Sequence, residues 1–311
     1  MRKGMKHYLS VFARGAAMGA ADVIPGVSGG TIAFITGVYH ELIDSLRSCD
    51  HHALRVLWQR GPKAAWQHIN GAFLLSLFGG ILLSIFSLAK LVTWCLERQP
   101  ILVWSFFFGL IAAASVHLLR QIPYWNPART LLLLLGMGIA LMVSEMRPAQ
   151  LPDTWWMLTL AGAIAICAMI LPGISGGFLL LMMGMYARVV EAVSQFQLLL
   201  LVPFALGCGL GLLLFSHVLS WLLRRFAAAT MALLTGILVG SLKIIWPWKV
   251  TVETTLNRHG EVVPLRQEAV LPAQYSELVS QPSQLVMALI VCLLGMALVL
   301  ALEFWAKRGD R

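Results

Sequence analysis

The sequence predicts an all-α polytopic membrane protein built as an inverted-topology repeat. Three observations support this fold class. The chain of 311 residues is 59% hydrophobic and only 12% charged, about half the charge of a typical soluble domain. Several apolar runs reach the roughly 20 residues that a membrane-spanning helix requires. The unit Pro-Gly-x-Ser-Gly-Gly occurs twice, at 25–30 and at 172–177.

Six apolar segments are the expected membrane spans. Glycines at small-xxx-small spacing, such as Gly15 and Gly19 or Gly207 and Gly211, are expected to let neighbouring helices pack closely. The spans are residues 72–89, 101–119, 130–143, 198–223, 228–246 and 285–302.

The basic residues set the expected orientation. Each Pro-Gly segment is expected to enter the membrane, break, and leave on the side that it entered. The N-terminus and loop 46–70 then share one side, which receives most of the Lys and Arg of the loops. The positive-inside rule places that side, with both termini, in the cytoplasm. The net charge of +9 follows these loops and does not indicate a nucleic-acid partner.

The duplicated unit divides one transmembrane domain, 1–311, into two repeats. The offset that superposes the two units also aligns Gly37 with Gly184 and Tyr39 with Tyr186. The first repeat, 1–147, is expected to hold a re-entrant hairpin at about 10–45 and three spans. The second, 148–311, is expected to hold a hairpin at about 155–192, three spans and an outer loop, 247–283. Because three crossings invert the orientation, the second repeat enters from the opposite face.

Two loops are long enough to have structure of their own. Loop 247–283 has nearly balanced charges and is expected to form a small outer cap, with a hairpin around 257–260 as one arrangement. Loop 51–70, with Trp58 and Trp66 among basic residues, is expected to form an amphipathic helix on the cytoplasmic surface. The histidines of that loop have no acidic or thiol partner at ligand spacing, so no metal and no cofactor are expected.

The duplicated unit has the chemistry of an anion site. Proline lacks an amide hydrogen, so a helix ends there and leaves carbonyl groups free. New half-helices are expected to begin near Ser28 and Ser175, where the first amides lack partners and the helix dipole is positive. Gly29 and Gly30 would let a ligand approach the backbone, and Thr31 adds a hydroxyl. Irregular backbone at membrane depth persists only where it is buried or lines a polar cavity.

Asp22 is an acidic residue beside this anion site, and three interpretations remain open. It could pair with Arg14, two helical turns earlier. It could bind a proton or a sodium ion and so couple transport to a gradient, because carboxylates in membranes are costly and usually functional. It could also cap nearby amides. The second repeat has Met169 at the equivalent position, so the acidic group is not duplicated.

Charged residues also follow each hairpin. Glu41 and Asp44 follow the first, and Arg188 and Glu191 occupy the equivalent positions of the second. They can be interfacial charges. Alternatively, Arg188 receives an anionic head group at the outer side, and Glu41 is a further candidate for ion coupling.

The segments RGAAMGAADVIPGVSGGTIAFITGVYHELIDSL (14–46) and ILPGISGGFLLLMMGMYARVVEAV (170–193) closely resemble the bacterial and archaeal polyprenyl-phosphate translocase family. The resemblance implies flipping of undecaprenyl phosphate, the lipid carrier of cell-wall precursors, across the bacterial cytoplasmic membrane. The second unit has Phe178 where the first has Thr31, so the hairpins need not contribute equally. The motif residues that the resemblance carries over are Arg14, Asp22, Pro25, Gly26, Ser28, Gly29, Gly30, Thr31, Pro172, Gly173, Ser175, Gly176 and Gly177.

Other functions are weighed against this one. A carrier or channel for a small anion such as phosphate could use the same site. A membrane enzyme is not expected, because no nucleophile lies beside a general base at plausible spacing. A structural scaffold would leave the duplicated polar break unexplained. The expected partners are the lipid substrate, membrane lipids and a coupling proton or sodium ion; the oligomeric state stays open.

Overall fold

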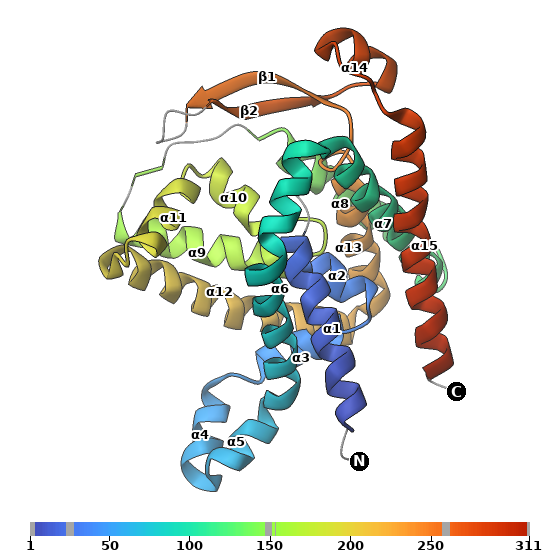
Figure 1. Cartoon of the computed structure of the whole chain (residues 1–311). Helices are drawn as coiled ribbons and strands as arrows, with labels where there is room; N and C mark the ends of the chain where they lie inside the picture. Colours follow the sequence, from blue (N-terminus) through green and yellow to red (C-terminus); the bar gives the residue numbers. More distant parts are fainter. Residues whose placement is uncertain (1–3, 23–27, 147–150, 153, 257–261, 310–311) are drawn as a thin grey trace.

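The computed structural model describes residues 4–22, 28–146, 151–152, 154–256 and 262–309. Helices dominate these residues, with one two-stranded sheet (Figure 1). The helices are α1 (Met5–Asp22), α2 (Gly29–Ile35), α3 (Tyr39–Arg47), α4 (His51–Arg60), α5 (Pro62–His68), α6 (Gly71–Arg98), α7 (Pro100–Gln121), α8 (Pro127–Ser144), α9 (Trp155–Ile170), α10 (Gly176–Met182), α11 (Tyr186–Ser194), α12 (Leu198–Arg225), α13 (Ala227–Ser241), α14 (Pro272–Val279) and α15 (Leu285–Gly309), and the strands are β1 (Lys249–Leu256) and β2 (Val262–Ala269).

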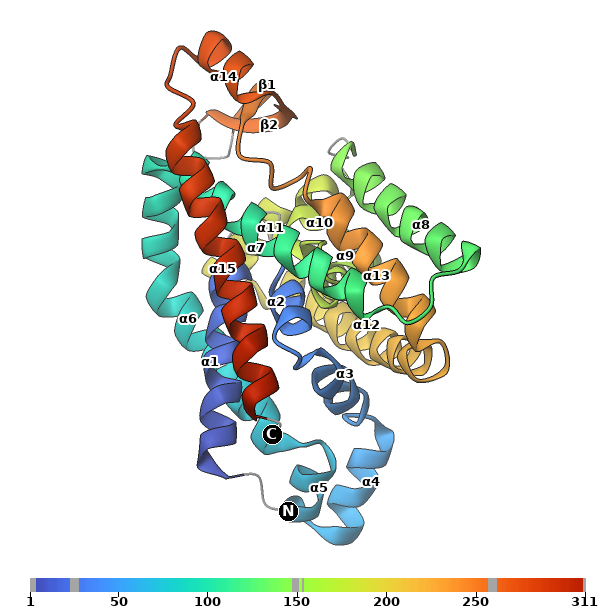
Figure 2. The ribbon, with the colours of Figure 1, turned by 90° about the vertical axis from the view of Figure 1, so that its right-hand side faces the viewer.

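The long helices pack in pairs. Helix α1 lies along α6 and α9 lies along α12, while α15 follows α7 and α8 follows α13 (Figures 1 and 2). Glycines allow these close approaches, as the spacing predicts. A methyl group at Gly15 would lie 2.1 Å from the carbonyl oxygen of Leu77, and one at Gly207 would lie 1.9 Å from that of Thr159. The same device therefore joins α1 to α6 and α9 to α12.

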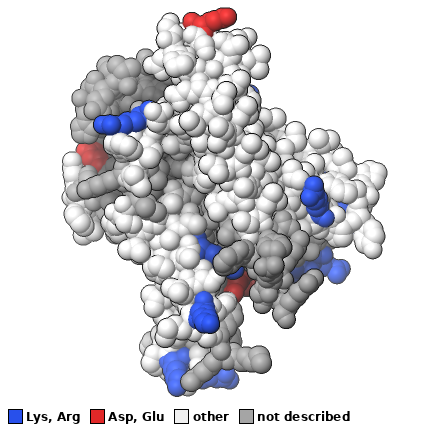
Figure 3. All heavy atoms as spheres, turned by 45° about the vertical axis from the view of Figure 1, so that its right-hand side comes forward, with Lys and Arg blue, Asp and Glu red and all other residues white. Residues whose placement is uncertain are grey.

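Three helices are long and apolar enough to cross a membrane, by the described residues: α7, α8 and α12. A fourth results if α5 and the first part of α6, which meet at a 69° bend, count as one span. Helix α13 and residues 285–301 of α15 are shorter apolar helices. Figure 3 shows a face that is mostly uncharged, with Lys and Arg at its lower end, near α4 and α5, and others toward its left and right margins. The chain is thus a helical membrane protein.

Two expectations about element boundaries are wrong. The expected span 228–246 ends early, because α13 stops at Ser241 and the next residues form short turns ahead of Pro247. Proline cannot donate an amide hydrogen bond and disfavours helix before it. Loop 51–70 forms two helices, since Gly61 adopts a φ of 81° and Pro62 begins α5. The side chain of Trp58 is almost fully exposed on the first of them.

Residues 247–283 form the expected small cap. Strands β1 and β2 pair antiparallel, with Lys249 opposite Ala269 and Leu256 opposite Val262. The turn expected around 257–260 lies outside the described residues. The indole nitrogen of Trp248 donates to the Ser283 carbonyl oxygen and so joins the two ends of the cap. Lys249 attaches the cap to α7, because its ammonium lies 3.9 Å from the centre of the Trp104 ring. Burial lowers the pKa of Lys249 to about 8.

Candidate functional site

Both half-helices begin where the sequence predicts. Ser28 is the N-cap of α2, and its hydroxyl accepts a hydrogen bond from the Gly30 amide at 3.1 Å. Ser175 is the N-cap of α10 and accepts from the Phe178 amide at 3.4 Å. Serine favours this position because its side chain pairs an amide that the helix leaves free. The break residues Pro25 and Gly26 lie outside the described residues.

The two breaks meet each other. The Ser28 hydroxyl donates to the carbonyl oxygen of Met169 at 3.1 Å, at the end of α9. The Thr31 hydroxyl accepts a hydrogen bond from the buried amide of Gly173 at 2.8 Å. Ser28 and Thr31 are both almost fully buried. Residues 142 positions apart in the chain are therefore joined inside the protein, between the first motif and the second.

The glycines of the first motif make room for protein atoms. A methyl group at Gly30 would lie 2.7 Å from the carbonyl oxygens of both Met169 and Ile170. A methyl group at Gly29 would lie 2.4 Å from a carboxylate oxygen of Asp22. The sequence pointed to glycines that admit a ligand, whereas in this structure the space beside them holds the end of α9 and a side chain.

Asp22 caps the first half-helix. Its carboxylate accepts a hydrogen bond from the Gly29 amide at 2.6 Å. It makes no ion pair with Arg14, a half-buried residue of α1, although both residues are described. Of the three interpretations of Asp22, capping is the one whose contact is present. The protein's own carboxylate thus lies on an amide that an anionic ligand would use.

The second motif is packed differently. Gly173 adopts a φ of 88°, which favours glycine, and lies against the backbone of Leu238 in α13. A methyl group at Gly176 would lie 2.3 Å from the Ala165 carbonyl oxygen. Gly177 is different, since a methyl group there would meet nothing closer than the Tyr186 ring at 3.7 Å. Pro172 lies between the end of α9 and this turn.

Glu41 and Arg188 lie on the helices that follow the half-helices. The Glu41 carboxylate accepts a hydrogen bond from the Asn70 side-chain amide at 2.8 Å. Arg188 lies 4.0 Å from Glu191, one turn along α11, and both are partly exposed. The Glu41 contact joins α3 to the residue before α6, and the Arg188 contact lies within α11.

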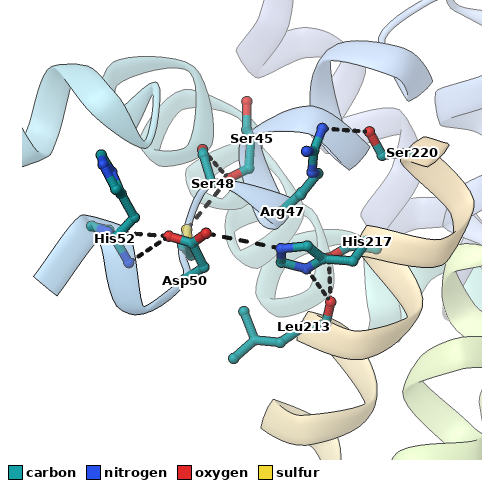
Figure 4. A network of polar contacts seen from close by, with 11 residues as sticks. Ser45, Arg47, Ser48, Asp50, His52, Leu213, His217 and Ser220 are labelled. Carbon is teal, nitrogen blue, oxygen red and sulfur yellow. Dashed lines mark hydrogen bonds and ion pairs between the residues drawn. The ribbon is translucent and has the colours of Figure 1, made fainter. Parts of the chain in front are cut away.

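A polar network joins α3 to α12. Its only indication in the sequence was a set of charges near a hairpin end. The Arg224 guanidinium lies 2.8 Å from the Asp44 carboxylate, which also accepts from the Ser220 hydroxyl at 2.7 Å. Arg47 donates to Ser220, and His217 lies 3.9 Å from Asp50 (Figure 4). A periodic signal exists in retrospect, because Ser220 and Arg224 are one helical turn apart and so share a face.

Asp50 is the part of this network outside the apolar helices, at the N-terminus of α4. Its slight burial opposes ionisation, but hydrogen bonds from the amides of Ala53 and His52 and the nearby imidazoles of His51 and His217 hold the pKa of Asp50 below its usual value. Asp50 is therefore a stable anion beside His217. Among the described residues, no three His, Cys, Asp or Glu side chains are grouped as metal ligands.

Taken together, the apolar helices define a helical membrane protein, and inside it the start of α2 contacts the end of α9 and the turn that follows it. The chain belongs to the VCA0040-like family, described as undecaprenyl phosphate translocase-like, whose model matches residues 18–263. This match confirms the resemblance seen in the sequence.

Two curated relatives carry the same name. The chain is 51% identical to a polyprenyl-phosphate transporter of Vibrio cholerae over 302 residues, which is 97% of this chain and 98% of the relative. It is 32% identical to a polyprenyl-phosphate transporter of Staphylococcus aureus over 252 residues, which is 75% of this chain and 84% of the relative. No solved structure matches the chain.

Proposed function

We propose that this protein moves polyprenyl phosphate, undecaprenyl phosphate in particular, between the leaflets of the bacterial cytoplasmic membrane. The observation that carries the proposal is the direct pairing of the two breaks by Ser28 and Thr31 in a chain aligned nearly end to end with a named polyprenyl-phosphate transporter. Flipping towards the cytoplasmic leaflet would return the carrier for envelope synthesis. The protein then acts as a transporter and not as an enzyme.

An inverted-topology repeat accounts for the order of elements. Helices α2 and α10 each have seven residues, α3 and α11 each have nine, and α6 and α12 each have 28. The pairing of α1 with α6 is matched by that of α9 with α12. We assign the repeats to 1–147 and 148–311, each with a re-entrant hairpin and three spans, and both termini to the cytoplasm. Broken helices at matching positions are where such transporters bind substrate.

The phosphate would bind at the paired breaks. The hydroxyls of Ser28, Thr31 and Ser175 and the amides that begin α2 are hydrogen-bond donors of the kind that phosphate requires. The Asp22 carboxylate occupies one of those amides in the present state. The Gly29 amide cannot donate to the Asp22 carboxylate and to a phosphate at the same time, and the two negative charges would repel each other. Asp22 must therefore move away or take up an ion when phosphate binds. This exchange would couple transport to a proton or sodium gradient.

The difference between the hairpin ends supports alternating access. Helix α3 is bonded to α12 through Asp44 and Arg224, and α11 has no comparable packing with α6 in the described part of the chain. In an inverted repeat these two helix pairs are equivalent, one near each membrane face. The present state would then be closed at the α3 end, and transport would exchange the two arrangements.

The proposal is tested by flipping of fluorescent undecaprenyl phosphate in liposomes containing the purified protein, with imposed pH or sodium gradients. We expect protein-dependent flipping that a gradient accelerates. Asp22→Asn should flip without gradient dependence, while Gly209→Ala, which adds a methyl group in open space, should match the wild type. Movement of inorganic phosphate without movement of the lipid would instead identify a small-anion carrier.

A further inference from the structure

A groove of about 490 Å³ runs between α9 and α12 and reaches the start of α10. No residue that lines it has a charged or hydroxyl side chain. Burying a phosphate or a peptide backbone in such a surface would leave their polar groups without partners, which is costly. The groove suits only an apolar ligand. Its lining residues are Ala163, Ile164, Cys167, Ala168, Leu171, Ile174, Leu179, Gly211, Leu214, Phe215 and Val218.

The floor of the groove is made by small residues where the two helices touch. A methyl group at Gly211 would lie 2.8 Å from the Cα atom of Ala163. The Cys167 thiol donates to the Gly211 carbonyl oxygen at 3.7 Å. The rim is made by larger side chains, with Leu214 68% exposed and Val218 52% exposed. A narrow ligand would therefore rest on backbone atoms and lie between branched side chains.

One end of the groove is lined by residues of the second break. Leu171 and Ile174, which line the groove, flank the Pro172–Gly173 turn. The Leu171 carbonyl oxygen lies 3.5 Å from the Ser28 hydroxyl, a donor proposed for the phosphate. An apolar chain attached to a phosphate at the breaks could continue into the groove without leaving the protein surface.

We propose that this groove binds the head-group-proximal isoprene units of the polyprenyl chain. The inference rests on the proposed function and adds the place of the lipid tail. Inside a membrane the hydrophobic effect gives no preference for protein over lipid, so the preference must come from van der Waals packing. A methyl-branched, unsaturated chain differs in shape from the straight acyl chains of ordinary lipids. The groove thereby contributes to selection of polyprenyl phosphates.

The test is photo-crosslinking of the protein in liposomes with an undecaprenyl phosphate analogue that carries a diazirine on its first isoprene unit. We expect labelled peptides from 163–179 and 211–218. Val218→Trp should fill the groove and reduce this labelling several-fold. Leu210→Trp is the matched control, since Leu210 lies on the same helix at similar exposure, 55%, and does not line the groove. Ile164→Trp provides a second groove variant, on α9, if the first fails to fold.

Competition separates the proposed ligand from bulk lipid. Excess undecaprenyl phosphate should suppress the labelling, and excess phosphatidylglycerol should not. Equal competition by both lipids, or labelling confined to other helices, would overturn the inference. Wild-type flipping measured in the same liposomes keeps the two proposals distinct. Flipping with labelling elsewhere rejects only the groove, whereas absence of flipping rejects the transport function itself.

Discussion

The two hairpins share a six-residue unit but use it in different ways. The first hairpin contributes the side chains of Ser28 and Thr31 to the contact between them. The second contributes backbone groups, the Met169 carbonyl and the Gly173 amide. Only the first has a carboxylate, that of Asp22, on its half-helix. The two motifs are therefore alike in sequence but make different contacts. The first copy supplies side-chain chemistry, and the second supplies a backbone surface against which it packs.

The largest difference between the motifs is expected from substitution of the equivalent glycines, Gly30 and Gly177. Gly30→Ala places a methyl group 2.7 Å from two backbone carbonyl oxygens, so we expect a loss of about 1–3 kcal/mol of stability, as for overpacked cores, and near-complete loss of flipping. Gly177→Ala meets only ordinary contacts and should retain most of both. Thermal unfolding in detergent and lipid flipping measure the pair. Equal effects at both positions would mean that the two motifs are packed alike.

The second prediction concerns the bond between the motifs. Thr31→Val keeps the side-chain shape but leaves the buried Gly173 amide without its acceptor, which costs about 1–3 kcal/mol. We expect a lowered Tm and slower flipping. Thr130→Val is the control, because the Thr130 hydroxyl donates to the Asn126 carbonyl oxygen at an exposed site. If Thr31→Val behaves like this control, the Gly173 contact is not important for the fold.

The sequence predicts features that depend on neighbouring residues better than contacts between segments far apart in the chain. The starts of α2 and α10 follow from proline and serine within a few residues, and the sequence placed them correctly. The adjacent Gly61 and Pro62 also indicate a helix break from local sequence alone, although a single helix was expected over 51–70. The partners of Thr31 and Asp44 were not predictable, because each lies on a distant segment whose position depends on the whole packing. For the same reason, Gly30 could be marked as a close approach while the group approaching it could not be named.

The third prediction compares the two N-cap serines. Ser28→Ala removes both the cap of α2 and the bond to Met169, while Ser175→Ala removes a single longer cap bond. Loss of a serine cap typically costs about 1 kcal/mol, so Ser175→Ala should cost that much or less and Ser28→Ala more. Unfolding of both variants under the same conditions measures the difference. A larger loss from Ser175→Ala would reverse the assignment of side-chain chemistry to the first motif.

The smallest effect on stability is expected at the hairpin ends. Arg224→Gln removes the ion pair with Asp44, whose side chains are 61% and 47% exposed, and such pairs contribute about 0–1 kcal/mol. The effect on flipping should be larger than this suggests, because in the proposed alternating-access cycle the pair holds α3 on α12 in one of the two arrangements. Lys243→Gln is the matched control, since it removes an exposed pair with Glu145 that links α8 to the end of α13. If Arg224→Gln alters the flipping rate and Lys243→Gln does not, at equal Tm, closure of α3 on α12 is part of the transport cycle. If the two variants flip at the same rate, the Asp44–Arg224 pair is an ordinary surface ion pair with no role in transport.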